Sequence, residues 1–274
     1  MRSNLVSVSI ARHTEPLGCT LTFGSLNIHS LSPLKLDALL VEQRERSLDV
    51  MILCETWHDS DSVSIQRLRA GGFGVVECAR PRTLRAEPSL AVNHGGVAII
   101  AVPGIHITGI PVGSCASTYE CVTARLVSRQ LACVVVLINR TSPVTTKFFT
   151  EFTATLDRFL TYVDPVIVAG DVNLHLERPS HPSTVEFRNL LYSYGLVQHV
   201  VGTTHDAGGT FAIVCTRDDP LSLDIETADV GLSDQRLLQW SMPPSADVHV
   251  GHLSRLAFVQ QRHFPHRPVI VGTL

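Results

Sequence analysis

Short runs of Val, Ile and Leu, each bounded by turn residues, recur along the chain and constrain its fold more than any other feature. Runs of roughly four to eight such residues are typical of buried β-strands. We predict strands over Leu21–Ile28, Val50–Cys54, Val97–Val102, Cys121–Val127, Leu131–Ile138, Val166–Ala169 and Phe211–Thr216. Buried strands need cover, so the sequence predicts a protein built in layers.

Three stretches between these runs carry apolar residues at helical spacing. We predict helices over Pro33–Ser47, Thr145–Tyr162 and Ser183–Tyr194. Their inward faces are predicted to carry Leu36, Leu39 and Leu40, then Phe148, Phe149, Phe152, Leu156, Phe159 and Leu160, and finally Val185, Leu190, Leu191 and Tyr194. Many short strands with few helices predict an α/β fold in which two sheets pack face to face with helices outside.

Length and composition place one folded domain in the chain. Apolar residues make up 45% of the 274 residues and charged residues only 17%, so a sizeable core can be buried. We assign residues 1–20 to an N-terminal extension and residues 21–241 to the domain. In residues 242–274 the strand pattern fades and Pro and His cluster, so a linker or tail is expected there.

The charge balance shows no strongly basic character. Lys and Arg total 22 and Asp and Glu total 25, for a formal charge of −3. Proteins that bind nucleic acid by neutralising phosphates often carry a basic excess, so tight electrostatic binding of DNA is not expected. An enzyme that touches DNA briefly is still compatible with this composition, because active sites built on carboxylates are themselves acidic.

Cysteine usage and hydropathy indicate the compartment. The seven cysteines are odd in number and include no CxxC pair, so we expect neither a disulfide-linked partner nor a zinc site. The first residues lack the apolar length of a secretory signal, and the longest apolar run, Leu131–Ile138, is too short to span a membrane. We expect a soluble intracellular protein of the cytoplasm or nucleus with no membrane association, and the oligomeric state is left open.

Several apolar runs end abruptly in a polar or acidic residue. These endings are Asn27, Glu55 and Asp171, the last of which is followed by Asn173. Each ending alone is an ordinary first solvated residue, but strand ends are also where side chains emerge into a crevice from a rigid base. Carboxylate and amide oxygens suit Mg²⁺, which takes few protein ligands, so the endings together predict an oxygen-ligand metal site.

Six motifs carry a family resemblance. They are Leu26-Asn27-Ile28-His29-Ser30, Glu55-Thr56-Trp57, Gly95-Gly96-Val97-Ala98-Ile99, Gly170-Asp171-Val172-Asn173-Leu174-His175, Thr204-His205 and Ser233-Asp234. In this order they resemble the endonuclease/exonuclease/phosphatase superfamily, and most closely the apurinic-type endonuclease domains of non-LTR (LINE-type) retrotransposons. The resemblance extends from about Leu21 to Trp240.

The resemblance implies a four-layered α/β sandwich of two packed mixed sheets flanked by helices. It also implies hydrolysis of DNA phosphodiesters with Mg²⁺, or with Mn²⁺ in its place. In that scheme Glu55 ligates the metal, with Asn27 and Asp234 close to it. Asp171 would orient or deprotonate the attacking water, and Asn173 would hold the scissile phosphate.

Three positions depart from the family's pattern, and the residues they replace all act on the same phosphate. Gln235 stands in place of a His, Ala212 in place of the Asp that orients this His, and Asn139 in place of a Tyr. A glutamine can donate a hydrogen bond but carries no titratable proton or positive charge. The resemblance therefore predicts a weakened DNA-nicking enzyme, and we hypothesise a decayed or domesticated copy of such an element.

Other interpretations stay open. A phosphatase of the same fold, acting on a phosphoinositide or sphingolipid, is one alternative, and a non-catalytic remnant that binds metal or nucleic acid is another. His58, His175 and His205 lie near the motifs, and we interpret each as a solvated loop residue that does not replace the missing His. Surface loops such as Arg80–His94 are expected to set any target-site preference.

Overall fold

The computed structural model describes residues 20–59, 61–80, 95–113, 116–129, 131–140, 143–217 and 223–243. Within these residues the chain forms two mixed sheets of six strands each. Across the first sheet the order is β11 (Glu226–Ala228), β12 (Leu237–Met242), β1 (Leu21–Asn27), β2 (Val50–Cys54), β4 (Val97–Ala101) and β3 (Gly74–Cys78). Across the second it is β5 (His106–Ile110), β6 (Glu120–Val127), β7 (Ala132–Asn139), β8 (Val166–Asp171), β10 (Ala212–Arg217) and β9 (Leu196–Gln198).

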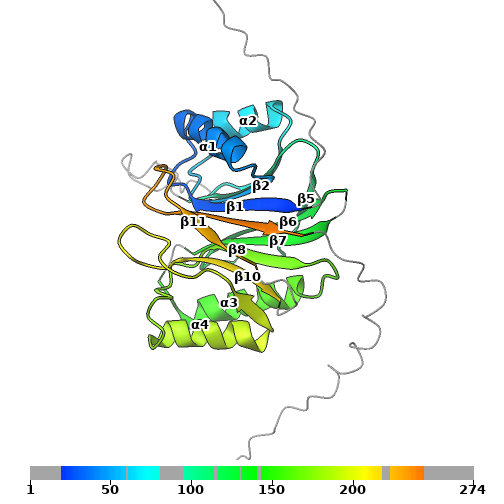
Figure 1. Ribbon diagram of the computed structural model, residues 1–274. Coiled ribbons are helices and arrows are strands. Elements are labelled where there is room, and N and C mark those ends of the chain that lie inside the picture. The colour runs from blue at the N-terminus through cyan, green and yellow to red at the C-terminus, as the bar shows by residue number, and fades with distance from the viewer. Residues whose placement is uncertain are drawn as a thin grey trace, which may run out of the picture. The chain divides into compact units, whose positions relative to one another are not determined.

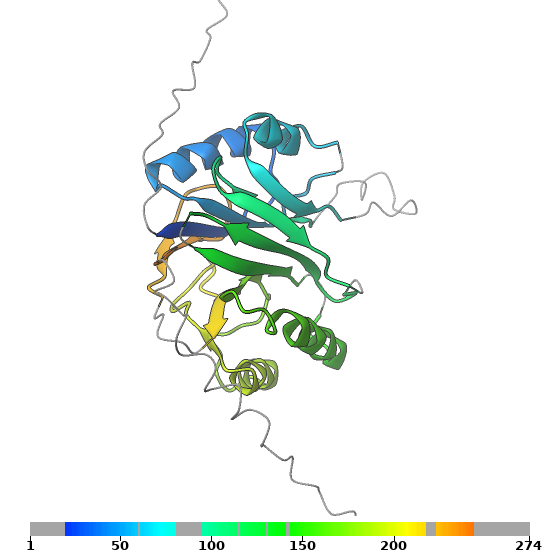
Figure 2. The same cartoon turned by 90° about the vertical axis from the view of Figure 1, so that its right-hand side faces the viewer.

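Helices cover the outer face of each sheet, which gives four layers (Figure 1, Figure 2). α1 (Pro33–Glu45) and α2 (Val63–Ala70) pack on the first sheet, and α3 (Thr146–Phe159) and α4 (Pro182–Ser193) pack on the second. The predicted four-layered α/β sandwich is therefore confirmed. No helix in the described part of the chain is long and apolar enough to cross a membrane.

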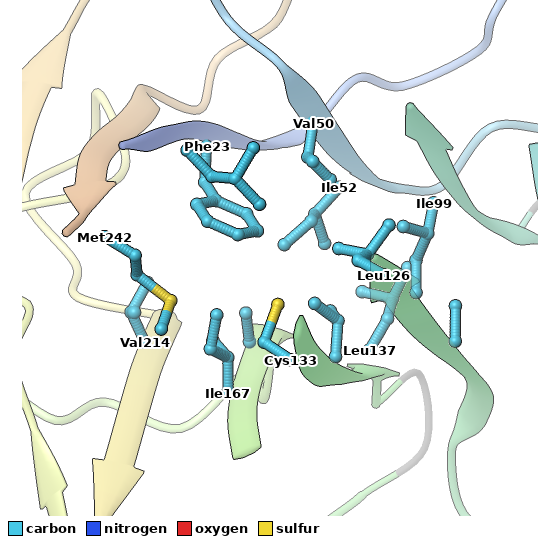
Figure 3. Close-up of a cluster of buried hydrophobic side chains, with 14 of the residues drawn as sticks. Phe23, Val50, Ile52, Ile99, Leu126, Cys133, Leu137, Ile167, Val214 and Met242 are labelled. Carbon is cyan, nitrogen blue, oxygen red and sulfur yellow. The ribbon is translucent and has the colours of Figure 1, made fainter. Parts of the chain in front are cut away.

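The inner faces of the two sheets meet in an apolar core (Figure 3). Phe23, Ile52 and Ile99 from the first sheet lie opposite Leu137 and Ile167 from the second, and all five are fully buried. Burial of one such side chain is favourable by about 1.5–3 kcal/mol. This core holds the two sheets in a fixed relation, so strand ends at a shared rim face one another.

Two parallel strand pairs decide which strand ends share that rim. β1 pairs with β2, and β7 pairs with β8, in parallel. α1 and α3 form the crossovers between these pairs, as parallel strands require. Asn27 and Glu55 therefore emerge from the first sheet side by side, and Asn139 and Asp171 do the same from the second.

One detail of the predicted helix faces is wrong. Val185 of α4 points to solvent, with 41% of its surface exposed, whereas Phe187 and Leu191 are buried. These two residues and Thr184 are three to four positions apart and so share one helical face. The remaining residues of the predicted faces are buried or pack against the core clusters.

The predicted outer segments are largely beyond what the structure describes. Residues 1–19 and 244–274 lie outside the described residues, as does most of the loop predicted to set target preference, 81–94. The last described strand ends at Met242, which is buried in the core between the sheets. β12 thus includes one residue beyond residue 241, the predicted end of the domain.

Candidate active site

A row of cross-strand partners runs along the rim of the second sheet. Glu120, Asn139, Asp171 and Ala212 are consecutive register partners on β6, β7, β8 and β10. Register partners present their side chains on the same face of a sheet, so Asn139 and Ala212 flank Asp171. Two of the three positions that depart from the family's pattern therefore lie directly beside one carboxylate.

Gly170 fixes the backbone from which Asp171 leaves the sheet. Its φ of +130° is one that L side chains rarely adopt, and a Cβ there would clash with the carbonyl oxygen of Ile138. Only glycine fits such a position without strain. The Gly-Asp pair is therefore required by the backbone and is not an ordinary turn.

The side chain of Asn27 connects the two sheets at the rim. Its Nδ2 donates to Glu55 Oε1 at 3.2 Å and to Asp171 Oδ2 at 2.9 Å. Asn27 and Asp171 are buried, with exposed fractions of 5% and 1%. The structure thus brings three of the strand-end residues together in one cluster.

Asp171 is held by three N–H donors. Its Oδ2 accepts from Asn27 and also from Gln235 Nε2 at 2.8 Å, and its Oδ1 accepts from the Asn173 backbone N–H at 2.8 Å. Burial and the nearby charge of Glu55 raise the pKa of Asp171, and the three hydrogen bonds oppose that rise. Gln235 is the third position that departs from the family's pattern. It contacts the carboxylate of Asp171, which Asn139 and Ala212 flank on the neighbouring strands.

Asn139 is directed to the far end of the row. Its Nδ2 donates to Glu120 Oε2 at 2.8 Å. Glu120 Oε1 accepts from Arg80 Nε at 2.7 Å and from the Gly96 N–H at 2.9 Å. Asn139 is fully buried and its Oδ1 has no hydrogen-bond partner. The Asn139 side chain is thus hydrogen-bonded to Glu120, on the opposite side of Asn139 from Asp171 in the register row.

Asn173 is engaged with the backbone. Its Nδ2 donates to the carbonyl oxygen of Arg140 at 2.7 Å, and the Arg140 guanidinium donates to the carbonyl oxygens of Val172 and Asn173. Arg140 is buried, which lowers its pKa, while Asp171 raises it. The predicted phosphate-holding amide is therefore next to Asp171 but already bonded to main chain.

The loop that carries Glu55 has an unusual backbone. Glu55 and Trp57 have φ values of +51° and +49°, in the left-handed region that non-glycine residues seldom occupy. Backbone bonds over-determine this loop: Thr56 N–H donates to Gly96 O at 3.1 Å, and Trp57 N–H donates to Gly95 O at 2.6 Å. Strain of this kind persists where the surroundings enforce it, and it clusters at functional sites.

A buried polar chain supports the same loop and corrects the interpretation of His58. Thr56 Oγ1 lies 2.6 Å from His58 Nδ1, and His58 Nε2 lies 3.0 Å from Glu77 Oε2. His58 is only 3% exposed, so its interpretation as a solvated loop residue was wrong. Its hydrogen bonds to residues on both sides, and not solvent, satisfy the imidazole.

Asp234 lies at the mouth of the site between two imidazoles. His29 Nδ1 is 3.2 Å from Asp234 Oδ1, and His205 Nε2 is 3.2 Å from Asp234 Oδ2. The other nitrogen of His29, Nε2, is 3.4 Å from Glu55 Oε2. His205 therefore contacts Asp234 while its side chain stays 22% exposed, and the His175 side chain is 46% exposed.

The oxygen atoms present suit a hard divalent cation. The Oδ1 atom of Asn27 is buried without a hydrogen-bond partner, and the Nδ2 atom of the same amide contacts the carboxylate of Glu55. A buried acceptor without a donor is costly, and a cation would satisfy it. Among the described residues no group of three or more His, Cys, Asp and Glu side chains forms a metal cage. The set fits Mg²⁺, which commonly uses one or two carboxylates and keeps several waters.

Comparison with solved structures decides the fold. The sequence matches no protein-family model and no curated relative. The structure is similar to the endonuclease domain of TRAS1, a telomere-specific non-LTR retrotransposon, with a TM-score of 0.59 at 14% identity over 83% of this chain and 100% of that one. The AP endonuclease LMAP from Leishmania major gives 0.59 at 15% identity over 82% and 88%. The 3′ phosphatase NExo from Neisseria, bound to a product DNA hairpin, gives 0.57 at 15% identity over 80% and 98%.

This chain has the endonuclease/exonuclease/phosphatase fold. Solved structures titled with that family name, from Leptotrichia buccalis and Beutenbergia cavernae, match it as well. The resemblance drawn from the motifs is thereby supported at the level of fold. The sequence did not single out Glu120 or His29 as functional positions. Glu120 immediately precedes a predicted strand instead of ending one, and it reaches the rim because it begins β6, which runs antiparallel to β7.

Replacement of His58 by Ala is expected to lower the free energy of unfolding by about 1–3 kcal/mol, because Thr56 and Glu77 would lose a buried partner. Urea denaturation measures this change. His106→Ala is the matched control, since His106 is exposed on edge strand β5, and its effect is expected to stay within about 0.5 kcal/mol. Equal effects of the two replacements would show that the chain through His58 does not support the fold.

Proposed function

We propose that this chain is a divalent-metal-dependent phosphodiester hydrolase that nicks DNA, with an activity weakened by loss of the phosphate-side groups. The observation that carries the proposal is the Asn27 amide, which joins Glu55 of one sheet to Asp171 of the other. Structural neighbours support it, since they include two endonucleases and a 3′ phosphatase bound to DNA.

All three residues that the family resemblance places at the metal, Glu55, Asn27 and Asp234, are present in this chain. Glu55, with Asn27 Oδ1 and Asp234 beside it, would hold Mg²⁺ or Mn²⁺. The bound ion supplies Lewis-acid polarisation of a phosphate oxygen and a template for the substrate. Asp171, fixed by its N–H donors, accepts a hydrogen bond from the attacking water and receives its proton. Because burial raises the pKa of Asp171, this carboxylate is a stronger base than an exposed aspartate.

The titratable side chains that the family resemblance places around the phosphate, a His, an Asp and a Tyr, are replaced here by Gln235, Ala212 and Asn139. Gln235 gives Asp171 a neutral donor, so the buried carboxylate stays hydrogen-bonded without an imidazole. Ala212 avoids a second carboxylate next to Asp171 in the register row, where like charges would repel. Asn139 is bonded to Glu120. These replacements suit a stable fold while removing groups that stabilise charge on a phosphate, and loss of such a group typically lowers the rate by about 10²- to 10⁴-fold.

Replacement of Glu55 by Gln is expected to abolish Mg²⁺-dependent nicking, because the amide retains the shape but loses the charge that holds the cation. Conversion of supercoiled plasmid to open circles measures the rate, which is expected to be slow for the unaltered chain. Glu226→Gln, an exposed carboxylate on β11, is the control and is expected to leave the rate unchanged. A rate that survives Glu55→Gln argues against the metal-dependent site.

The combined replacement Gln235→His, Ala212→Asp and Asn139→Tyr is expected to raise the nicking rate by about 10²-fold or more, since it restores an oriented imidazole beside the phosphate. The same plasmid assay measures it. Gln235→His alone lacks the orienting carboxylate and is expected to gain little. Vigorous nicking by the unaltered chain would refute the weakened state, and inactivity of the triple variant, if it folds, would favour the non-catalytic alternative.

A further inference from the structure

A band of five rings crosses the mouth of the site. Trp57 and His29 stack with ring centroids 6.0 Å apart, and Phe211 packs edge-to-face with His205 and His175 at centroid distances of 5.4 Å and 4.9 Å. Asp234 connects the two groups, because His29 and His205 contact its two oxygens at 3.2 Å each. We call this set the ring band: Trp57, His29, His205, Phe211 and His175.

The ring band is built from both sheets. His29 and Trp57 follow β1 and β2 of the first sheet, whereas His175 follows β8 and Phe211 precedes β10 of the second. Phe211 O accepts from the N–H of Val172, the residue next to Asp171. The rings therefore lie on both sides of the carboxylates at which the proposed function places the phosphodiester.

Local contacts hold the ring band while leaving part of it open to solvent. His205 Nδ1 accepts from the Ala207 N–H at 3.0 Å, and His175 Nδ1 is 2.6 Å from Glu177 Oε1. The exposed side-chain fractions of His29, His205 and His175 are 34%, 22% and 46%. Rings that are fixed in place yet accessible lose little conformational entropy when a flat ligand stacks on them.

A depression of about 260 Å³ continues the ring band beyond Trp57. Its lining includes Ser30, Ser32, Trp57, Asp59 and Ser62. Hydroxyl and carboxylate oxygens next to an aromatic ring suit the N–H groups of a nucleobase, whereas a phosphate would meet the negative charge of Asp59. The surface next to the proposed scissile position therefore favours bases over backbone.

The charge of the chain points in the same direction. The formal charge is −3, and the three acidic side chains that contact the ring band, Glu55, Asp234 and Glu177, offer no attraction to phosphates. A duplex presents mainly its phosphates and the edges of its bases, because the base faces are stacked inside. Unpaired bases present their faces, and stacking on aromatic side chains is worth about 1–3 kcal/mol per base.

We propose that the ring band binds single-stranded nucleic acid, stacking unpaired bases on both sides of the phosphodiester at Asp171 and Asp234. The position of that phosphodiester rests on the proposed function, but the binding itself requires no hydrolysis. A bound strand, such as a locally unpaired stretch of supercoiled DNA, is thus recognised through base faces, with little contribution from phosphate neutralisation, so its affinity depends only weakly on salt.

Fluorescence anisotropy with the full chain in EDTA tests this binding separately from hydrolysis. The probes are a labelled DNA strand of about 12 nucleotides, its duplex, an RNA strand of the same sequence and a strand of abasic nucleotides. The two base-bearing single strands are expected to bind at least about tenfold more tightly than the duplex and the abasic strand. The RNA and DNA arms show which sugar is preferred.

Trp57→Leu and Phe211→Leu are each expected to weaken single-strand binding by about fivefold or more, the loss that one stacked base implies. His175→Ala carries less risk to folding because this side chain is nearly half exposed, and the same direction is expected. Tyr192→Ala, an 86% exposed aromatic on α4, is the control and is expected to change nothing.

Equal affinity for the single strand and the duplex, or for the base-bearing and abasic strands, would overturn the proposal. Unchanged binding by all three ring variants would overturn it as well. If binding follows the expected pattern but no variant hydrolyses DNA, the proposed hydrolase fails and the ring band stands as a binding site.

Discussion

The side-chain amide of Asn27 joins the two halves of the site, and the arrangement of the other polar groups at the rim depends on it. One Nδ2 atom donates to carboxylates from two different sheets, 28 and 144 residues away in the chain. Its Oδ1 is left buried without a donor, a condition that costs about 1–3 kcal/mol. The strained φ of Glu55 adds a further cost at the same place. Costs that accumulate around one point of a well-packed core support the proposal that these residues form a functional site.

The central part of the fold could be predicted from the sequence because its strands are buried on both faces. Val50–Cys54 is a continuous apolar run, and β2 has these same bounds. The edge strands and α2 could not be predicted in this way. β5, His106–Ile110, mixes exposed and half-buried positions and carries no apolar run, because only one of its faces packs against the rest of the protein. Edge pairing depends on the neighbouring strand, which a local pattern does not contain.

For the site, the sequence predicted the residues that lie where apolar runs stop. Asn27, Glu55 and Asp171 meet because the strands before them end at the same rim. The end of each apolar run in the sequence marks the end of such a strand. Glu120 could not be found by this rule, because it begins its strand and reaches the rim only through antiparallel pairing. His58 lies in a loop but is buried, and one of its hydrogen-bond partners, Glu77, belongs to another strand, which local sequence does not show.

The proposed hydrolysis requires Glu55 and Asn27 to present their oxygens to one divalent cation beside Asp171. Anomalous diffraction from crystals soaked in Mn²⁺ tests it most directly, because the scattering peak locates the ion without reference to activity. We expect a peak within coordination distance of Glu55 and of Asn27 Oδ1, and loss of that peak in Glu55→Gln crystals. A peak elsewhere, or none at saturating Mn²⁺ with these side chains turned apart, would contradict it.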